Sequence, residues 1–244
     1  MKRIISGFFG ILLTLSTVAE TPKVDTVAIM ILDQMSHVIG DLHSASFTAN
    51  IKNDVIDREV GLISEFKVSE IIFDGPNKML IHSKGGKGHR GFWYNGELMA
   101  YYSYDENNYV IFDALPTTLQ TIDSIHSAFG IDFPAADFLY PTFTDDLLSA
   151  SDEVIFNGRK IIEGTECFHI IAHGEKATYQ LWISSDAFNL PIKMLIIDRT
   201  KNPALQYEST FSNWQLNHEY PPSIFEFLTP PGAHEIKILP KSTK

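Results

Sequence analysis

The stretch Gly91-Phe-Trp-Tyr-Asn-Gly-Glu-Leu-Met-Ala-Tyr-Tyr102 reads as two β-strands joined by Asn95-Gly96. Asn-Gly favours a two-residue type I′ turn, because both central residues of that turn have positive φ. Such a turn fixes the register of the hairpin and places Tyr94 opposite Glu97.

Both faces of this hairpin are apolar. One face carries Phe92, Tyr94, Met99 and Tyr101, and the other carries Trp93, Leu98, Ala100 and Tyr102. Antiparallel strands that are apolar on both faces are covered on both sides. We therefore expect this hairpin in the middle of a sheet, with other parts of the chain packed on each face.

Short strands separated by turns are expected along most of the chain. In residues 45–51, Ala45, Phe47, Ala49 and Ile51 alternate with polar residues, which is typical of a half-buried antiparallel strand. Further strands are expected at 66–73, 78–82, 107–112, 154–162, 167–173, 178–184, 191–197 and 207–216. The glycine-rich segment 84–90 predicts a surface loop that leads into the hairpin.

Helices are expected at two places. Asp25 can cap a helix whose apolar residues follow helical spacing from Ala28 to Leu42. A helical insert at about 116–150 interrupts the strands, with Pro116 suited to the first turn of its first helix. An antiparallel meander with such helices indicates the α+β class: a strongly curved, open sheet with helices in its concave face.

The N-terminus has the features of a secretory signal peptide. Lys2 and Arg3 precede an apolar run that ends at Val18, and Thr17-Val-Ala19 offers small residues for cleavage after Ala19. The run is shorter than the roughly 20 residues that a membrane span needs. We expect a cleaved signal peptide over residues 1–19, export to the periplasm and no stable membrane anchor.

Charge and cysteine content exclude some classes of protein. The 244-residue chain has a formal net charge of −11, which disfavours binding to the phosphates of nucleic acids. Cys167 is the only cysteine, so an intramolecular disulfide is impossible. We interpret Cys167 as a small buried apolar residue.

An ordered set of motifs covers nearly the whole mature chain. They are Gly88–Leu98, Gly130–Tyr140, Gly164–His169, Leu181–Ser184 and Phe225–Ala233. This set resembles the bacterial family of predicted periplasmic proteins called domain of unknown function 2092. That family in turn is similar to the lipoprotein carriers LolA and LolB, in a wider group that includes mycobacterial lipid carriers and a periplasmic stress-sensor domain.

The resemblance implies a LolA/LolB-like half-barrel of antiparallel strands, with helices over a hydrophobic cavity that binds acyl chains without catalysis. It further implies one domain over residues 20–244, interrupted by the insert. Candidate ligand-binding residues are the aromatic and methionine side chains of the hairpin and the insert, namely Phe92, Tyr94, Met99, Tyr101, Phe129 and Phe138. Segment 84–90 is a basic cluster, and Lys84, Lys87 and Arg90 could form a rim for an anionic headgroup or a partner.

No catalytic or metal-binding pattern is convincing. Cys167 and His169 share one face of a strand, but no further ligand pair has the spacing that a metal needs. Ser64-Glu-Phe-Lys67 fits a Ser-x-x-Lys pattern, yet that chemistry needs a helix and the context here is a strand. We predict no catalytic residue, no metal and no cofactor.

The sequence thus predicts a periplasmic, non-enzymatic binding or carrier protein for a lipid, a lipoprotein acyl chain or another hydrophobic ligand. The alternative is a protein-interaction or envelope-sensing module that uses the same sheet to bind an envelope protein. A hydrolase that uses Ser64 and His169 is the least favoured hypothesis.

Overall fold

The computed structural model describes residues 23–133 and 135–239. The predicted signal peptide, residues 1–19, lies outside the described residues. The described chain contains three α-helices, two short 3-10 helices and thirteen strands. The helices are α1 (Thr26–Gly40), α2 (Thr118–Phe129), η1 (Ala136–Leu139), α3 (Phe143–Ser149) and η2 (Pro222–Phe225).

The strands of the first half agree in position with those predicted, and most are longer. They are β1 (Lys23–Val24), β2 (Ser44–Asp57), β3 (Gly61–Asp74), β4 (Lys78–Gly85), β5 (Gly88–Tyr94), β6 (Leu98–Ser103) and β7 (Asn108–Asp113). Those of the second half are β8 (Glu153–Ile162), β9 (Thr165–His173), β10 (Ala177–Ser184), β11 (Pro191–Asp198), β12 (Leu205–Leu216) and β13 (His234–Glu235).

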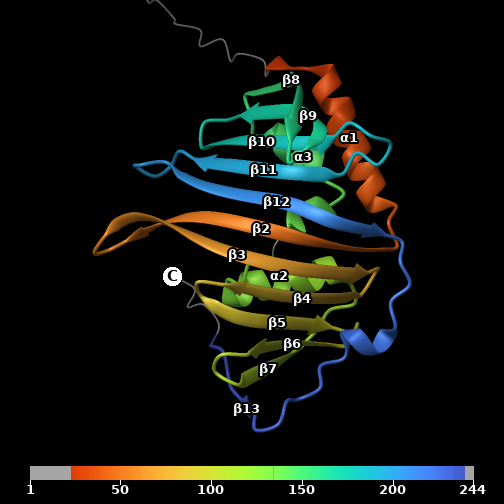
Figure 1. The fold of residues 1–244 in the computed structure, drawn as a ribbon, viewed down its shortest axis with the longest axis vertical. Coiled ribbons are helices and arrows are strands. Elements are labelled where there is room, and N and C mark those ends of the chain that lie inside the picture. Colours follow the sequence, from red (N-terminus) through yellow and green to blue (C-terminus); the bar gives the residue numbers. More distant parts are fainter. Residues whose placement is uncertain (1–22, 134, 240–244) are drawn as a thin grey trace, which may run out of the picture.

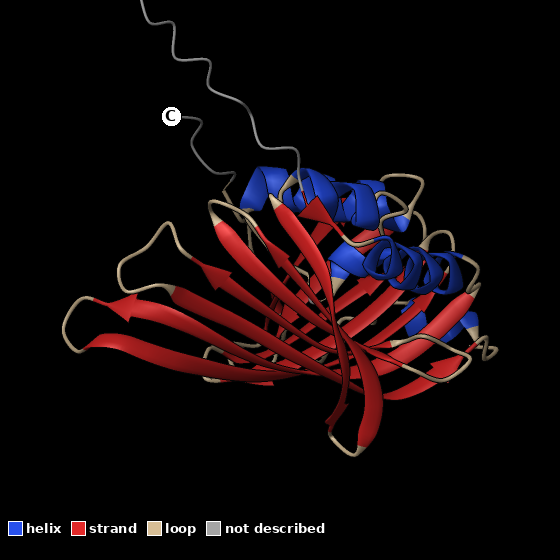
Figure 2. Ribbon diagram, turned by 90° about the horizontal axis from the view of Figure 1, so that it is seen from above, coloured by secondary structure: helices blue, strands red, loops and turns tan. Residues whose placement is uncertain are grey.

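All described strands belong to one sheet in the order β1-β8-β9-β10-β11-β12-β2-β3-β4-β5-β6-β7-β13 (Figure 1). Only the two-residue end strands β1 and β13 pair in parallel with their neighbours. The sheet is open and curves around helices that lie on one side of it (Figure 2). The prediction of an α+β, half-barrel-like curved sheet with helices in its concave face is confirmed.

The pairing of β12 with β2 joins two meanders into this single sheet. Residues Tyr207 to Leu216 of β12 run antiparallel to Asn53 to Ala45 of β2, with an irregularity after Ser212. This contact links positions more than 150 residues apart in the sequence. It therefore sets the curvature and depth of the concave face, which neither meander defines alone.

Helix α1 closes the β8 end of the concave face. The Asp25 side chain caps it, since its Oδ1 accepts a hydrogen bond from the Val27 backbone N–H at 2.8 Å. The other carboxylate oxygen accepts from the N–H of Phe156 in β8 at 3.4 Å. Leu32 and Met35 are fully buried on the inner stripe of the helix, as the helical spacing predicted.

The core lies between the concave face and the helical insert. Phe211 of β12 is only 2% exposed, and its ring packs edge-on against Phe47 of β2 and Phe138 of η1. Phe138 also contacts Phe143 of α3, with ring centroids 5.1 Å apart. The aromatic residues of the insert thus pack against the seam between the two meanders.

The hairpin β5–β6 forms where predicted, but the predicted register was wrong by two residues. Tyr94 pairs with Met99 and not with Glu97. Asn95 does not take the positive φ that a type I′ turn needs. Its side-chain oxygen instead accepts a hydrogen bond from the Leu98 N–H at 2.9 Å, which stabilises a longer connection. A shift of two leaves each residue on its predicted face.

Both faces of this hairpin are covered, as expected. On the concave side the Tyr94 hydroxyl donates to the Leu115 carbonyl at 2.6 Å, just before α2. On the convex side the C-terminal segment crosses the sheet, and Phe227 packs on Trp93 with centroids 5.2 Å apart. This segment then forms β13 beside β7.

The interpretation of residues 84–90 as a surface loop was wrong. Lys84 pairs with His89 and Gly85 with Gly88, so β4 and β5 form a tight hairpin around Gly86-Lys87. Glycine content alone suggested a loop, but glycines also occur where two backbones approach closely. A Cβ atom at Gly85 would clash with the backbone of β3.

We expect Phe211→Ala to lower the free energy of unfolding by about 3–5 kcal/mol, because it leaves a cavity at the seam between the two meanders. Chemical denaturation followed by circular dichroism measures this loss. Phe188→Ala is the matched control, since Phe188 is 56% exposed and should change stability by less than about 0.5 kcal/mol. Equal effects of both substitutions would contradict this account of the core.

Candidate ligand-binding site

A cavity of about 620 Å³ opens on the concave face. Its walls come from the inward-facing positions of β2, β3, β4, β5, β6 and β12 and from the segment after α2. The outward-facing Phe66 of β3 and Lys84 of β4 also contribute to its lining. Its apolar and aromatic lining on that side includes Ile51, Phe92, Tyr101, Ile131, Phe133, Tyr207 and Ile238. Pockets of about 300–1,000 Å³ are typical of sites for small organic ligands.

The segment after α2 reaches the cavity because the helix ends sharply. Gly130 takes the left-handed conformation (φ 70°) and its N–H bonds to the His126 carbonyl at 2.8 Å. This is the usual role of a glycine after a helix C-terminus. The chain then brings Ile131 into the cavity wall, and the Phe133 ring packs against Phe92 with centroids 5.3 Å apart.

Charged side chains surround the mouth of the cavity. Four are basic and two are acidic: Lys67, Lys84, Lys87, Arg90, Glu65 and Asp132. Both acids have close partners, because Glu65 pairs with Lys87 at 2.7 Å and Asp132 pairs with His126 at 2.8 Å. The cavity is therefore locally positive in an acidic protein.

Lys67 is a cation on the inner face of the sheet. It lies on β3 in phase with the buried residues Ser69, Ile71 and Phe73. Burial lowers the pKa of its ammonium group, and the charge of Asp132 opposes that shift. Among the described residues, Lys67 has no carboxylate within 4.0 Å.

Two tyrosines keep their hydroxyl groups neutral inside the site. Burial raises the pKa of Tyr207 to about 12, with a smaller opposing effect from Ser209. Burial also raises the pKa of Tyr101, and the neighbouring charge of Arg90 opposes this increase. Both hydroxyls can therefore donate hydrogen bonds at neutral pH.

The structure distributes the six predicted ligand-binding residues over two environments. Phe92 and Tyr101 line the cavity. Tyr94 and Met99 are completely buried farther along the same face of the hairpin. The remaining two pack within the core, where Phe129 contacts Phe112 at 4.9 Å and Phe138 contacts Phe211.

The three predicted rim residues all contribute to the mouth of the cavity. Lys84 is exposed, and its strand position points it toward the convex side. Lys87 lies in the turn between β4 and β5 and Arg90 lies on the inner face of β5. The tight hairpin brings these side chains to one edge of the site.

Sequence reasoning missed Lys67, Tyr207 and Ile131 as residues of this site. Lys67 left a readable signal, because it is a charge in phase with the apolar side of a strand. Tyr207 had none, since its place in the wall depends on the pairing of β12 with β2.

A second, smaller cavity of about 370 Å³ lies between the insert and strands β10 and β11. Its charged lining residues are Asp137 and Asp146, so this cavity is locally negative, whereas the larger cavity is locally positive. Leu181, Met194 and Ile196 supply the apolar sheet side. The concave face thus presents two apolar hollows with different charge.

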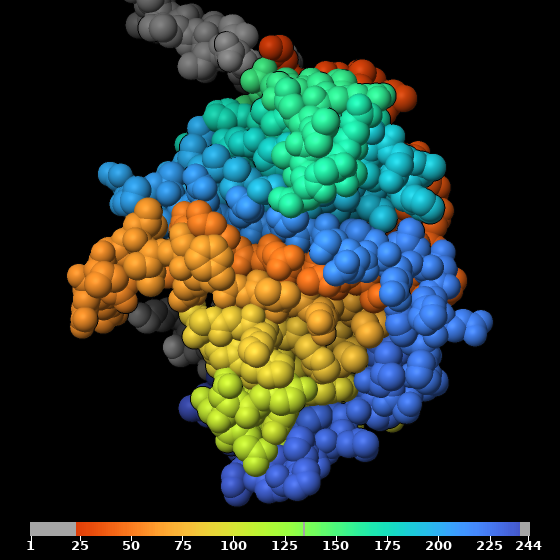
Figure 3. Space-filling view, viewed as in Figure 1, coloured from red at the N-terminus to blue at the C-terminus, as the bar shows by residue number. Residues whose placement is uncertain are grey.

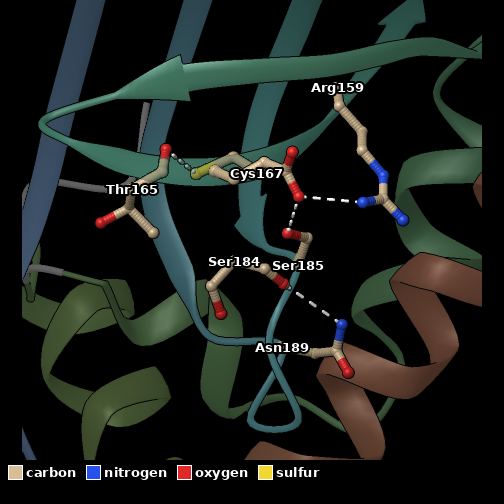
Figure 4. A network of polar contacts seen from close by, with 7 residues as sticks. Arg159, Thr165, Cys167, Ser184, Ser185 and Asn189 are labelled. Atoms are coloured by element: carbon tan, nitrogen blue, oxygen red, sulfur yellow. Dashed lines mark hydrogen bonds and ion pairs between the residues drawn. The ribbon is translucent and has the colours of Figure 1, made fainter.

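Cys167 lies in a polar network near the start of β9 (Figure 4). Its thiol donates to the Thr165 carbonyl at 3.5 Å, and the side chain is fully buried. Next to it, Glu166 accepts hydrogen bonds from Arg159 at 2.9 Å and Ser185 at 2.8 Å. These contacts hold the turn after β10 against the start of β9.

His169 is held by neutral partners and not by an acid. Its Nδ1 lies 3.0 Å from the Asn157 amide nitrogen and its Nε2 lies 3.1 Å from the Gln180 amide oxygen. The ring stacks on Trp182 at 4.5 Å, and burial lowers the pKa of His169. Within the described residues, no three histidine, cysteine or acidic side chains are grouped as a metal site would need.

The hydrolase candidates are far apart. Four strands separate β3, which carries Ser64, from β9, which carries His169, a span of roughly 24 Å. Ser64 donates instead to Asp54 at 2.6 Å. Ser64 and Lys67 project to opposite faces of β3, so they do not form a Ser-x-x-Lys pair.

The fold and the larger cavity define an open half-barrel of the α+β class with an amphipathic pocket in its concave face. None of the helices in the described part of the chain has the length and apolarity to cross a bilayer. Residues 28–239 match the family described as Predicted periplasmic protein (DUF2092), and the chain belongs to that family. This match confirms the predicted family and periplasmic location. No curated protein matches the sequence.

Solved structures with similar folds have low sequence identity. The lipoprotein LppX from Mycobacterium tuberculosis is 14% identical, with 78% of this chain and 96% of that chain covered and a TM-score of 0.49. The Pseudomonas aeruginosa MucA/MucB complex is 13% identical, with 83% of this chain and 61% of that chain covered and a TM-score of 0.45. A LolA superfamily protein from Nitrosomonas europaea is 9% identical, with 82% of this chain and 97% of that chain covered and a TM-score of 0.38.

We expect the Cys167 thiol to react very slowly in the native protein. Burial raises its pKa to about 11, aided by the nearby charges of Asp186 and Glu166. The thiolate fraction is then about one in a thousand at pH 8 and rises about tenfold per pH unit until the pKa is reached. Labelling with a thiol reagent against pH, with urea-unfolded protein as the reference, checks this. Native labelling as fast as the unfolded reference at pH 8 would contradict it.

Proposed function

We propose that this protein is a periplasmic, non-enzymatic binding or carrier protein that buries the apolar chain of a lipid or acyl ligand. The observation that carries the proposal is the 620 Å³ cavity on the concave face, whose wall is mainly apolar and aromatic. Such a cavity offers a ligand burial from water without any covalent step.

The energetics of burial favour a long apolar chain. Each methylene removed from water contributes about 0.8 kcal/mol, so several methylenes outweigh the cost of ordering the ligand. Phe92, Tyr101 and Ile131 supply the surface against which the chain packs. Tyr94, Met99 and Phe138 belong to the buried core that also contains Phe92, and the partly buried Phe129 packs against that core.

The helical insert and the basic rim complete the proposed site. One domain over residues 20–244 carries both, and the insert at about 116–150 supplies Ile131 and Phe133. Lys84, Lys87 and Arg90 lie around the entrance, where a polar headgroup or a partner can meet them.

A non-enzymatic role agrees with the arrangement of reactive side chains. Ser64 bonds to Asp54, and His169 is held by Asn157 and Gln180 on a distant strand. Neither residue reaches the cavity lining.

One observation favours a second candidate function, binding to an envelope protein. The β2–β3 hairpin projects beyond its neighbours, because β12 pairs only as far as Asn53 and β4 only as far as Lys67 (Figure 3). Its projecting part exposes apolar side chains, with Val60 73% and Phe66 62% exposed. Unpaired strand edges with apolar side chains can add a strand from another protein.

The central test is native mass spectrometry of protein purified from the periplasm, combined with organic extraction. A co-purifying lipid of defined mass, together with uptake of a fluorescent fatty acid by the delipidated protein, is the expected result. Protein that is empty and also fails to take up the fluorescent fatty acid would overturn the carrier proposal.

We expect Ile131→Trp to weaken binding of the fluorescent fatty acid at least tenfold, because the larger ring fills the cavity. A tenfold change corresponds to about 1.4 kcal/mol. Ile161→Trp is the matched control, since Ile161 is 76% exposed on β8 and lies outside the cavity. Fluorescence titration compares the two variants. If the titration shows that Ile131→Trp binds the fatty acid as tightly as the control does, the acyl chain of the ligand does not lie in this cavity.

For the second candidate, we expect the double variant Val60→Ser, Leu62→Ser to lose a stoichiometric envelope partner while fatty-acid uptake stays unchanged. Both side chains are exposed on the projecting hairpin and outside the cavity. Crosslinking in the periplasm followed by purification measures the partner. Retention of the partner by this variant would exclude the hairpin as its binding surface.

A further inference from the structure

We propose that the cavity selects a single-chain amphiphile with an anionic head, carboxylate or phosphate, and that Lys67 and Arg90 bind this head inside the mouth. This inference rests on the proposed function and names the ligand class. It differs from a diffuse basic rim, because it assigns the headgroup to two specific side chains on the inner face of the sheet.

Lys67 is built into the wall of the cavity. Its neighbours across the strands are Ile51 in β2 and Gly85 in β4. Because Gly85 has no side chain, the backbone of β4 lies directly against Lys67, where a Cβ atom would clash. The stem of Lys67 therefore starts against glycine backbone beside Ile51, and burial lowers the pKa of its ammonium group. A cation in such surroundings gains most from an anion that arrives with the ligand.

Arg90 supplies a second donor that lacks an acceptor. Its Nη1 is buried and makes no hydrogen bond within the described residues. The carboxylate of Asp105 is 3.9 Å away, which is too far for a hydrogen bond. Gly88 has a φ of 105°, and a Cβ atom there would clash with the guanidinium. The sequence thus makes room for this group beside Tyr101.

The charges that remain at the site favour an anion. Lys87 already neutralises Glu65, and His126 contacts Asp132. Lys67 and Arg90 are then left without a close hydrogen-bonded carboxylate. Charge-assisted bonds to carboxylate or phosphate are stronger than bonds between neutral groups. The chain as a whole has a net charge of −11, so the positive site does not follow from its composition.

A matched ligand series tests the inference on delipidated, full-length protein purified from the periplasm. Hexadecanoic acid, hexadecyl phosphate and hexadecanol share one chain and differ in the head. Each competes with a fluorescent fatty acid, and inorganic phosphate alone is the fourth competitor. We expect the affinity for each anionic amphiphile to be at least about tenfold higher than the affinity for the alcohol. This is the size of effect that a charge-assisted hydrogen bond gives.

The variants separate a headgroup contact from a structural role. Lys67→Met keeps an apolar stem. It should reduce the affinity for the anions about tenfold and leave the affinity for hexadecanol nearly unchanged. Lys67→Arg should retain the preference, and Arg90→Gln should reduce it. Lys176→Met is the control, since Lys176 is exposed in the turn between β9 and β10. Circular dichroism confirms that each variant is folded.

The outcomes are distinguishable. If wild-type protein binds hexadecanol and the anions equally, the inference fails and the proposed function stands. If none of the amphiphiles binds, both fail. If inorganic phosphate competes as strongly as hexadecyl phosphate, the site binds free anions, and the proposal of an amphiphilic ligand is overturned. Loss of hexadecanol binding together with the anions in a folded Lys67→Met would also overturn the headgroup role.

Discussion

The pairing of β12 with β2 is the constraint on which the rest of the structure depends. It joins two meanders, β8 to β12 and β2 to β7, whose strands are hydrogen-bonded within each meander. The result is one sheet long enough to curve around the helices. Phe211 and Phe47 reinforce this seam on the concave side, where Phe138 of the insert covers them. The seam therefore fixes both the curvature of the sheet and the position of the helical insert.

The cavity follows from an incomplete match between this sheet and its helices. Helices α1 and α3 pack near the β8 end. Leu115, just before α2, covers the inner side of the β5–β6 hairpin, and Phe129 at the end of α2 packs on Phe112 of β7. Between them, near the projecting hairpin, no helix in the described part of the chain contributes a residue to the cavity lining. Tyr207 and Lys67 line the cavity there together with the buried Ile51, on strands joined through the pairing of β12 with β2.

Local patterns were sufficient to predict most of the elements. The cap at Asp25 and the alternation from Ala45 to Ile51 are signals that tertiary contacts did not overrule. Patterns that depended on a specific turn were less reliable. Asn95-Gly96 is a strong hairpin signal, yet the Asn95 side chain stabilised a longer connection. Gly85 serves the close approach of two backbones, and Gly88 takes a positive φ beside the Asp105 and Arg90 side chains, so neither marks a loop.

The site was harder to predict than the fold, for a physical reason. Aromatic side chains such as Phe92 and Phe138 look alike in sequence, whether they line a cavity or fill the core. Which of them meets solvent depends on how far each helix extends over the sheet.

A charge is more informative, since a lysine in phase with the apolar face of a strand is costly to bury unless something compensates it. Lys67 meets that description, and no carboxylate in the described chain compensates it closely. A residue that reduces the stability of the free protein is retained most readily where a ligand restores the balance. By this reasoning the most informative positions of the cavity are not its aromatic residues but Lys67 and Arg90, the two cations that line it from the inner face of the strands.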